Sequence, residues 1–301
     1  MGVRGAYAAK IVDFRMLKQR IITALVLLAI LLPALFASRP APFIALTLVL
    51  IAAAAWEWAR LVGWGSTAAL GSGALCALLC MLLWWGGAVE QPNRLIWLAA
   101  AAAGVPGGAW LLRRGVPGWP QIPTGLRWAG GLLVLCVAWL AMAQARTIGI
   151  NLLLSILVLV WAADVFAYFA GRGLGGKFSS SKLAPSISPG KSWEGVWGGM
   201  LGVLLVACVW IWIDRAYALD IPSIYTRLYE RGAWLLVAGC VFLSAMSVVG
   251  DLVESLVKRS AGVKDSSGLL PGHGGVLDRI DALLPVLPLA MMLVTVSGAM
   301  V

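Results

Sequence analysis

The residues most suited to chemistry lie between Ser255 and Asp281, in a polar, charge-dense stretch between two strongly apolar segments. Carboxylate oxygens are ligands for hard divalent cations, and Lys and Arg side chains bind phosphate. A membrane protein that keeps such groups at the edge of a span has the parts needed to hold metal and phosphate at a bilayer surface. The charged residues are Asp265, Asp278, Asp281, Lys258, Arg259, Lys264 and Arg279.

The apolar segment before this stretch ends in a polar helical face. Asp251, Glu254, Ser255 and Lys258 stand at i, i+3, i+4 and i+7, so they share one side of a helix. A carboxylate that faces lipid is costly, so this side is expected to face the protein interior or a water-filled cavity. The alternative is a purely structural network of polar side chains between helices.

Two acidic edges predict a divalent-cation site. Asp278 and Asp281 lie three residues apart at the start of the last apolar segment, opposite the acidic end of the earlier one. Mg²⁺ usually takes one or two carboxylates together with phosphate oxygens and water. Asp251 and Asp278 are the first candidates as ligands, with Asp265 and Asp281 in reserve. A second cation on the same carboxylates stays open.

A second polar loop, residues 171–194, is expected to bind phosphate. Ser188 and Lys191 can both reach triphosphate oxygens from a turn. The same loop contains G-x-x-x-x-G-K spacing, but Phe178 stands where a phosphate-binding loop needs Ser or Thr, and an apolar helix precedes it instead of a strand. Asp164, inside that helix, is expected to be functional or paired.

Both polar regions resemble the phosphatidate cytidylyltransferases, the CDP-diacylglycerol synthases. The C-terminal region matches the signature of that family at Ser255, Lys258, Arg259, Lys264, Asp265, His273, Gly274, Gly275, Asp278, Arg279 and Asp281. The earlier loop matches at Asp164, Ala167, Tyr168, Ser188, Pro189, Lys191, Ser192, Glu194 and Gly195, with Ser192 in place of the usual threonine. The motifs cover about the last 140 residues.

The resemblance implies an enzyme that transfers cytidylyl from CTP to phosphatidic acid and releases pyrophosphate. It supports Mg²⁺ on Asp251 and Asp278. A phosphate monoester is already anionic, so it can attack without a general base. The residues expected to act on the nucleotide or its phosphates are Ser188, Lys191, Ser192, Lys264, His273, Gly274, Gly275 and Arg279. Lys258 and Arg259, at headgroup depth, are expected to meet the lipid phosphate.

The elements that must position these residues are membrane helices. Hydrophobic residues make up 61% of the chain, charged residues 12%, and the mean hydropathy is +0.92. A span needs roughly 20 apolar residues in a helix. The fold class expected is therefore all-α and polytopic, with nine spans near residues 21–36, 43–61, 67–85, 95–112, 128–143, 150–170, 195–213, 233–252 and 282–300.

Charge placement predicts the orientation of these spans. With a cytoplasmic N-terminus, most of the 23 Lys and Arg residues fall on the cytoplasmic side, together with both polar loops. The expected organisation is a basic tail (1–20), an N-terminal membrane region (21–148) and a C-terminal catalytic region (149–301) with cytoplasmic loops 171–194 and 256–281. The expected location is the cell membrane.

Several alternatives follow from the same residues. A CTP-dependent lipid kinase would also bind CTP and lipid, and a transporter would use charged loops to gate an organic anion. The net charge of +10 is better explained by topology and anionic lipid headgroups than by a nucleic acid partner. The oligomeric state stays open, a homodimer included.

Overall fold

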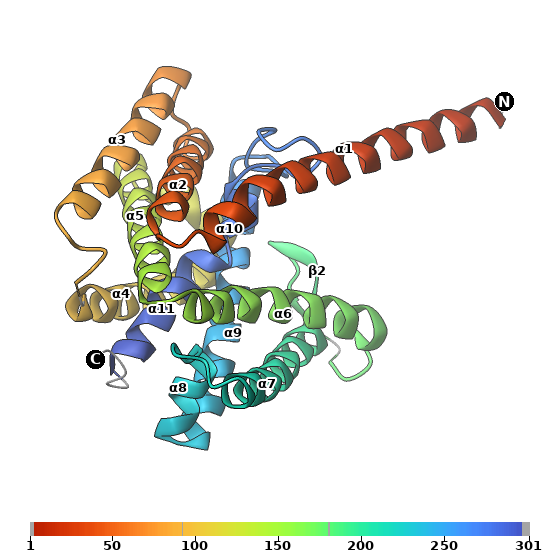
Figure 1. The fold of residues 1–301 in the computed structure, drawn as a ribbon. Helices are drawn as coiled ribbons and strands as arrows, with labels where there is room; N and C mark the ends of the chain where they lie inside the picture. The colour runs from red at the N-terminus through yellow and green to blue at the C-terminus, as the bar shows by residue number, and fades with distance from the viewer. Residues whose placement is uncertain (1–2, 92, 180, 297–301) are drawn as a thin grey trace.

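The computed structural model describes residues 3–91, 93–179 and 181–296, and this part of the chain is almost entirely helical (Figure 1). Within it, nine helices are long and apolar enough to cross a membrane. The predicted fold class and the nine spans are therefore confirmed. The predicted end of the last span, residue 300, lies outside the described residues.

The elements follow one another in a simple order. They are α1 (Val3–Phe36), α2 (Ala41–Leu61), α3 (Ser66–Trp85), α4 (Arg94–Gly118), η1 (Trp119–Gln121), α5 (Thr124–Ile148), α6 (Ile150–Leu174), β1 (Lys182–Ala184), β2 (Ser188–Ser192), α7 (Trp193–Ala216), α8 (Ile224–Arg231), α9 (Ala233–Ser260), α10 (Leu277–Ile280) and α11 (Leu283–Val296).

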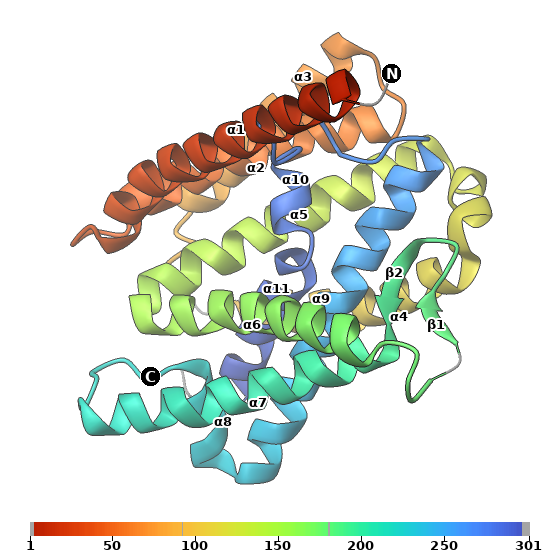
Figure 2. The same ribbon diagram turned by 90° about the vertical axis from the view of Figure 1, so that its right-hand side faces the viewer.

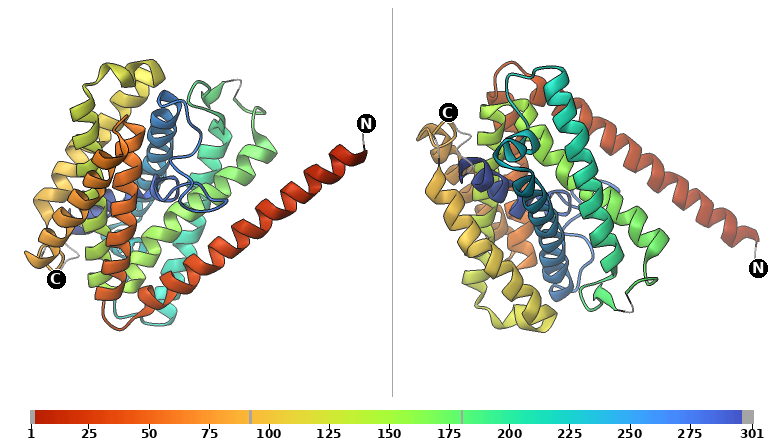
Figure 3. Two further views of the ribbon diagram at one scale, coloured as in Figure 1. Left: turned by 90° about the horizontal axis from the view of Figure 1, so that it is seen from above. Right: turned by 90° about the horizontal axis from the view of Figure 1, so that it is seen from below.

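The helices form two groups joined by a central pair. α2 packs closely on α3 and also on α5, while α6 packs along α7. α9 and α11 contact each other and lie between these groups, with α4 against both (Figures 1 and 2). α1 contacts chiefly α2 and extends away from the rest of the molecule (Figure 3). The central pair carries the acidic segments, so the fold places them between the two groups.

Glycines let α6 and α7 approach closely. A Cβ added at Gly198 would lie 2.1 Å from Ala170 Cβ, and one at Gly202 would lie 2.1 Å from Phe166 Cγ. Small residues at such positions are typical of helix pairs in membranes, where close backbone packing replaces the hydrophobic drive of water. This tight pair fixes both ends of the intervening loop and of its β1–β2 hairpin.

The structure corrects the predicted boundaries. Most of the spanning helices run further than hydropathy alone predicted, because charged and polar residues continue the helix beyond the apolar core. α4 reaches Gly118 after a break at Gly115, which has a φ of 65°, and α5 begins at Thr124. The first span is the end of a helix that begins at Val3. The hairpin and the short helix α8 were not predicted.

Cysteines pack between α3 and α5, as expected for buried thiols. Cys76 and Cys136 have their sulfur atoms 3.7 Å apart, and both are buried. With Cys80 they form a group whose sulfur atoms lie within 4.8 Å of one another. The sequence did not predict this grouping, because it joins two helices.

Replacing Gly131 by Ala is expected to destabilise the fold by about 1–3 kcal/mol, because a Cβ there would lie 1.9 Å from the Trp58 indole. That indole donates hydrogen bonds to the backbone carbonyls of Arg127 and Trp128, so it is not free to move away. Thermal unfolding of the purified protein in detergent measures the loss. The neighbouring Gly130→Ala is the control, because nothing lies within 4 Å of its added Cβ. Equal melting temperatures for the two variants would contradict this packing.

Candidate active site

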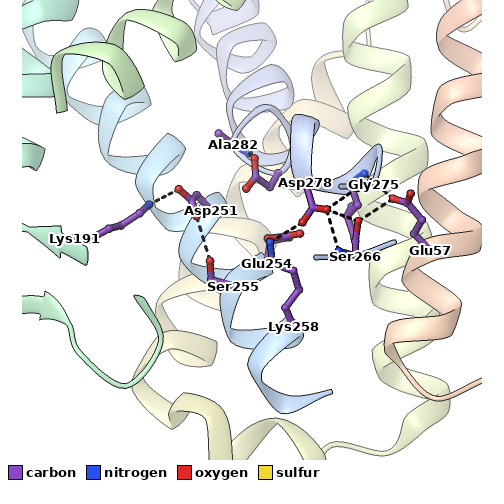
Figure 4. A network of polar contacts seen from close by, with 12 residues as sticks. Glu57, Lys191, Asp251, Glu254, Ser255, Lys258, Ser266, Gly275, Asp278 and Ala282 are labelled. Carbon is purple, nitrogen blue, oxygen red and sulfur yellow. Dashed lines mark hydrogen bonds and ion pairs between the residues drawn. The ribbon is translucent and has the colours of Figure 1, made fainter. Parts of the chain in front are cut away.

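An ion pair joins the earlier polar loop to the acidic face of α9. Lys191, at the end of β2, contacts the Asp251 carboxylate on α9, and the Ser255 hydroxyl donates to the other Asp251 oxygen at 3.3 Å (Figure 4). About one third of the Asp251 side chain is exposed. The contact brings the hairpin onto the acidic face of α9. The structure therefore brings Lys191 and Asp251 together, while a phosphate contact for Lys191 and a metal ion on Asp251 stay predictions.

A buried lysine joins the acidic helix face to the last loop. The Lys258 ammonium lies 2.5 Å from Glu254 Oε2 and 2.6 Å from Asp278 Oδ1 (Figure 4). All three side chains are largely buried, so the ammonium offsets carboxylate charge that would otherwise be very costly. Lys258 is thus held by two carboxylates, whereas the neighbouring Arg259 is exposed.

The second oxygen of Asp278 organises the loop before α10. Asp278 Oδ2 accepts hydrogen bonds from the Ser266 amide (2.9 Å), the Ser266 hydroxyl (2.9 Å) and the Gly275 amide (2.7 Å). A Cβ at Gly274, where φ is +83°, would lie 2.5 Å from the same oxygen. The glycines predicted to approach phosphate thus let the backbone approach a carboxylate, and the Gly275 amide is already used.

Glu57 holds the same loop from the other side. This fully buried carboxylate, on α2, accepts hydrogen bonds from the Val276 amide (2.9 Å), the Leu277 amide (2.7 Å) and the Ser267 hydroxyl (2.6 Å). The Ser266 hydroxyl lies 3.1 Å from Glu57 Oε2, the oxygen that also accepts from the Leu277 amide, so this hydroxyl faces both Glu57 and Asp278. In the sequence, Glu57 stands out only as a charged residue inside an apolar span. That feature does not distinguish a residue of a functional site from one that packs between helices.

Glu194 holds the earlier loop in the way that Glu57 holds the last one, by accepting hydrogen bonds from loop amides. Its Oε1 accepts hydrogen bonds from the amides of Gly176 (3.1 Å), Phe178 (3.1 Å) and Ser179 (2.9 Å). Ser192 caps the N-terminus of α7, and its hydroxyl accepts from the Gly195 amide at 3.2 Å. The retained hydroxyl at position 192 thus has a structural use in helix capping. A phosphate contact for Ser192 stays a prediction.

A polar cavity of about 520 Å³ opens beside the last loop. Three basic residues line it, Arg20 from α1, Lys264 from the loop and Arg279 from α10, together with His273 and Asp265. Excess positive charge around a cavity of this size suits a polyphosphate. In the sequence, Arg20 is one of the basic residues of the N-terminal tail that indicate topology. No sequence pattern links it to this cavity, because the contact joins opposite ends of the chain.

Contacts between α1 and the loop place Arg20 in this wall. The Thr23 hydroxyl donates to the Pro271 carbonyl at 3.0 Å. A Cβ at Gly272, whose φ is +77°, would lie 2.8 Å from Arg20 Cγ. Glycine at 272 therefore both permits the backbone conformation and makes room for the arginine. The first helix, which carries no chemical motif, closes one side of the cavity.

The remaining predicted residues lie in two places. Asp164 and Asp281 lie close enough to Asp251 for the three carboxylates to repel one another, while Lys191 and Lys258 offset part of this charge. Ser188 begins β2, on the strand that carries Lys191. Asp251 and Asp278 are held by different lysines and share no hydrogen-bonding partner. The acidic group and the basic cavity are thus neighbouring parts of one polar region.

The carboxylate oxygens in this region are of the type that binds a hard cation. Asp251 is partly exposed, and within the described part of the chain its observed hydrogen bonds and ion pair come from Lys191 and Ser255, which leaves oxygen lone pairs available. The two oxygens of Asp278 accept four hydrogen bonds, three of them on Oδ2 from the loop and one on Oδ1 from Lys258. A cation bound at Oδ1 would therefore take the place of Lys258. Asp281 accepts only the Ala282 amide among the hydrogen bonds observed in the described residues. One or two such carboxylates with phosphate oxygens suffice for Mg²⁺.

Fold and site together define a multi-span membrane protein in which a group of carboxylates lies beside a basic cavity of about 520 Å³. The chain matches the cytidylyltransferase family over residues 18–297, and it belongs to that family of nucleotidyltransferases. A Pseudomonas aeruginosa relative named phosphatidate cytidylyltransferase is 38% identical, with 94% of this chain and 98% of the relative aligned. Relatives of the same name from Haemophilus influenzae (38% identity, 91% and 96%) and Bacillus subtilis (43%, 44% and 42%) are also similar.

Glu57→Gln is expected to loosen the last loop, because one carboxamide cannot accept all the hydrogen bonds that the carboxylate accepts. Each buried donor left unpaired costs about 1–3 kcal/mol. Hydrogen exchange of amides 266–277 should become faster, and cytidylyl transfer should fall with it. Glu90→Gln, at an exposed site, is the control. Unchanged exchange in Glu57→Gln would show that this carboxylate does not hold the loop.

Proposed function

We propose that this protein transfers the cytidylyl group of CTP to phosphatidic acid, forming CDP-diacylglycerol and pyrophosphate. The observation that carries this proposal is the convergence of both family motifs on one polar region, joined by the Lys191–Asp251 pair beside a basic cavity. The names of the relatives support the same reaction. It places the protein in phospholipid biosynthesis.

The chain's own residues would chiefly bind and orient phosphate. Arg20, Lys264 and Arg279 surround the cavity from three directions and would hold the triphosphate. Their positive charge would stabilise the departing pyrophosphate, whose negative charge grows as the bond to the α-phosphorus breaks. His273 lies in the same wall as a further phosphate contact. The lipid phosphate needs no general base, because it is already anionic.

Asp251 and Asp278 would hold Mg²⁺, with Asp281 as the better-placed reserve. Asp265 lines the basic cavity, whereas Asp281 interacts with Asp251 itself. The ion would supply charge neutralisation for the attacking and leaving oxygens. Until it binds, Lys191 and Lys258 occupy the carboxylates. A second cation on these carboxylates remains part of the proposal.

The proposed orientation puts both polar loops on the cytoplasmic side of the cell membrane, where CTP is available. The excess of Lys and Arg on that side supports it. Arg259, exposed at the last turn of α9, would then meet lipid phosphate at headgroup depth. The homodimer left open by the sequence stays a prediction, which light scattering of the detergent-solubilised protein would test.

A labelling experiment tests the reaction. Purified protein in detergent is incubated with phosphatidic acid, Mg²⁺ and CTP labelled at either the α- or the γ-phosphate. The proposal expects α-label in lipid and stoichiometric release of pyrophosphate. Entry of γ-label into lipid would instead identify a CTP-dependent kinase. Lipid or anion binding without any pyrophosphate would favour the transporter.

Asp251→Asn and Asp278→Asn are each expected to lower turnover by about 10²-fold or more, because each removes a charge that serves the proposed metal ion. The double variant should lose little beyond either single one, since residues that act as a unit are not additive. Turnover is measured at saturating Mg²⁺, with melting temperature as a check on folding. Asp220→Asn, at an exposed position, should stay active. Full activity of Asp251→Asn would refute the metal assignment.

Single cysteines at Ser181 and Ala261 test the orientation, because both positions are exposed in the two polar loops. In a background without the five native cysteines, both should resist a membrane-impermeant thiol reagent in intact cells and react after lysis. A cysteine in place of Asp220, which is exposed on the connection between α7 and α8, should show the reverse. Labelling of position 181 or 261 in intact cells would overturn the orientation.

A further inference from the structure

A second cavity, of about 410 Å³, lies between α2 and α3 and has an apolar lining. It is formed by Ala52, Ala53 and Trp56 from α2, Gly73 and Ala74 from α3, and Leu269 from the last loop. The small side chains make the hollow. Gly73 is needed where the helices meet, because a Cβ there would lie 2.9 Å from the Ala52 carbonyl oxygen. The hollow is therefore a built feature of this helix pair.

The side chain of Arg60 lies one helical turn beyond Trp56, at one end of this apolar cavity, which we call the trough. Ala52, Trp56 and Arg60 are spaced four residues apart, so they follow one face of α2. The exposed Arg60 guanidinium lies 5.1 Å from the centre of the Trp56 ring, a cation–π distance. Among the described residues no carboxylate forms an ion pair with Arg60. An apolar trough that ends in an available guanidinium matches an acyl chain with an anionic headgroup.

The trough also adjoins the basic cavity through one short segment of chain. Ser267, Gly268 and Leu270 line the basic cavity, while Leu269 lines the apolar one. Glu57, next to Trp56 in the sequence, holds this segment through the Ser267 hydroxyl at 2.6 Å. The segment 267–270 thus separates the two cavities and contributes residues to both. A lipid in the trough would lie next to the proposed nucleotide site.

We propose that the trough between α2 and α3 binds an acyl chain of the phosphatidic acid substrate, while Arg60 meets its phosphate as the lipid enters from the bilayer. The inference rests on the proposed function for the identity of the lipid. It adds a lipid-binding surface on the N-terminal half of the chain, where the sequence shows no chemical motif. Bulk phospholipid covering the same surface is the outcome that the test must separate.

Photolabelling tests occupancy without turnover. The wild-type protein, in phosphatidylcholine vesicles without CTP, is irradiated with phosphatidic acid that carries a diazirine in its acyl chain. Labelled peptides are then mapped by mass spectrometry. Labelling should concentrate on residues 52–56 and 70–74, and unlabelled dioleoyl phosphatidic acid should compete while added phosphatidylcholine should not. Uniform labelling of the lipid-facing helices, or equal competition by both lipids, would overturn the proposal.

Kinetics with two chain lengths provide a second test. Ala74→Leu should raise the KM for dioleoyl phosphatidic acid about tenfold, since added methylene groups fill the trough, and leave the KM for CTP unchanged. The KM for dihexanoyl phosphatidic acid should change little. Ala102→Leu, exposed on α4 outside the trough, is the matched control. Equal effects of Ala74→Leu on both chain lengths would contradict an acyl-chain site.

Arg60→Gln should raise the KM for both lipids, and Arg60→Lys should restore most of the loss, because charge is the property invoked. A neutral variant that binds both lipids as the wild type does would remove Arg60 from the proposal. The photolabelling result also separates the acyl-chain site from the proposed cytidylyl transfer reaction. Competed labelling in a protein that forms no CDP-diacylglycerol would support the trough while refuting the proposed reaction.

Discussion

The buried Glu57 carboxylate is the interaction on which the polar region depends. In a membrane protein, an unpaired buried charge is so costly that the surrounding backbone must satisfy it. Here two amides and two hydroxyls of the last loop do so, from residues 209 to 220 positions away in the sequence. The loop therefore cannot leave α2 without exposing a buried carboxylate. The same rule applies to Glu194, which fixes the earlier loop through three amides.

Charge pairing also explains how several carboxylates can lie close together. Lys191 pairs with Asp251, and Lys258 bridges Glu254 and Asp278. Among these carboxylates are the two that we propose as ligands for Mg²⁺, Asp251 and Asp278. Removing one partner of a buried pair is more destabilising than the pair itself is stabilising. This applies to Lys258, whose two carboxylate partners are buried, and less to Lys191, whose pair with Asp251 is partly exposed.

Most of the fold could be predicted from the sequence, because a span is a local property. Hydropathy over about 20 residues identified the nine candidate spans that the described residues contain, and helical spacing placed Asp251, Glu254, Ser255 and Lys258 on one face. Contacts between distant segments could not be predicted in this way. The roles of Glu57 and Arg20, the latter in the wall of the basic cavity, require that α2 and α1 lie against a loop more than 200 residues later. The use of Gly274 and Gly275 beside Asp278 also follows only from side-chain placement.

A reaction between a water-soluble nucleotide and a lipid imposes opposite demands on one site. The nucleotide needs a wet cavity with fixed positive charge, and the lipid needs an apolar surface that continues the bilayer. This fold meets both demands with one loop whose neighbouring residues line cavities of opposite character. Because adjacent residues of this loop line different cavities, the position of the loop relative to both cavities has to be fixed. The buried Glu57 and Asp278 carboxylates, each with several hydrogen bonds to the loop, fix that position. The N-terminal helices, which carry no motif, are thereby needed for the geometry of the C-terminal site.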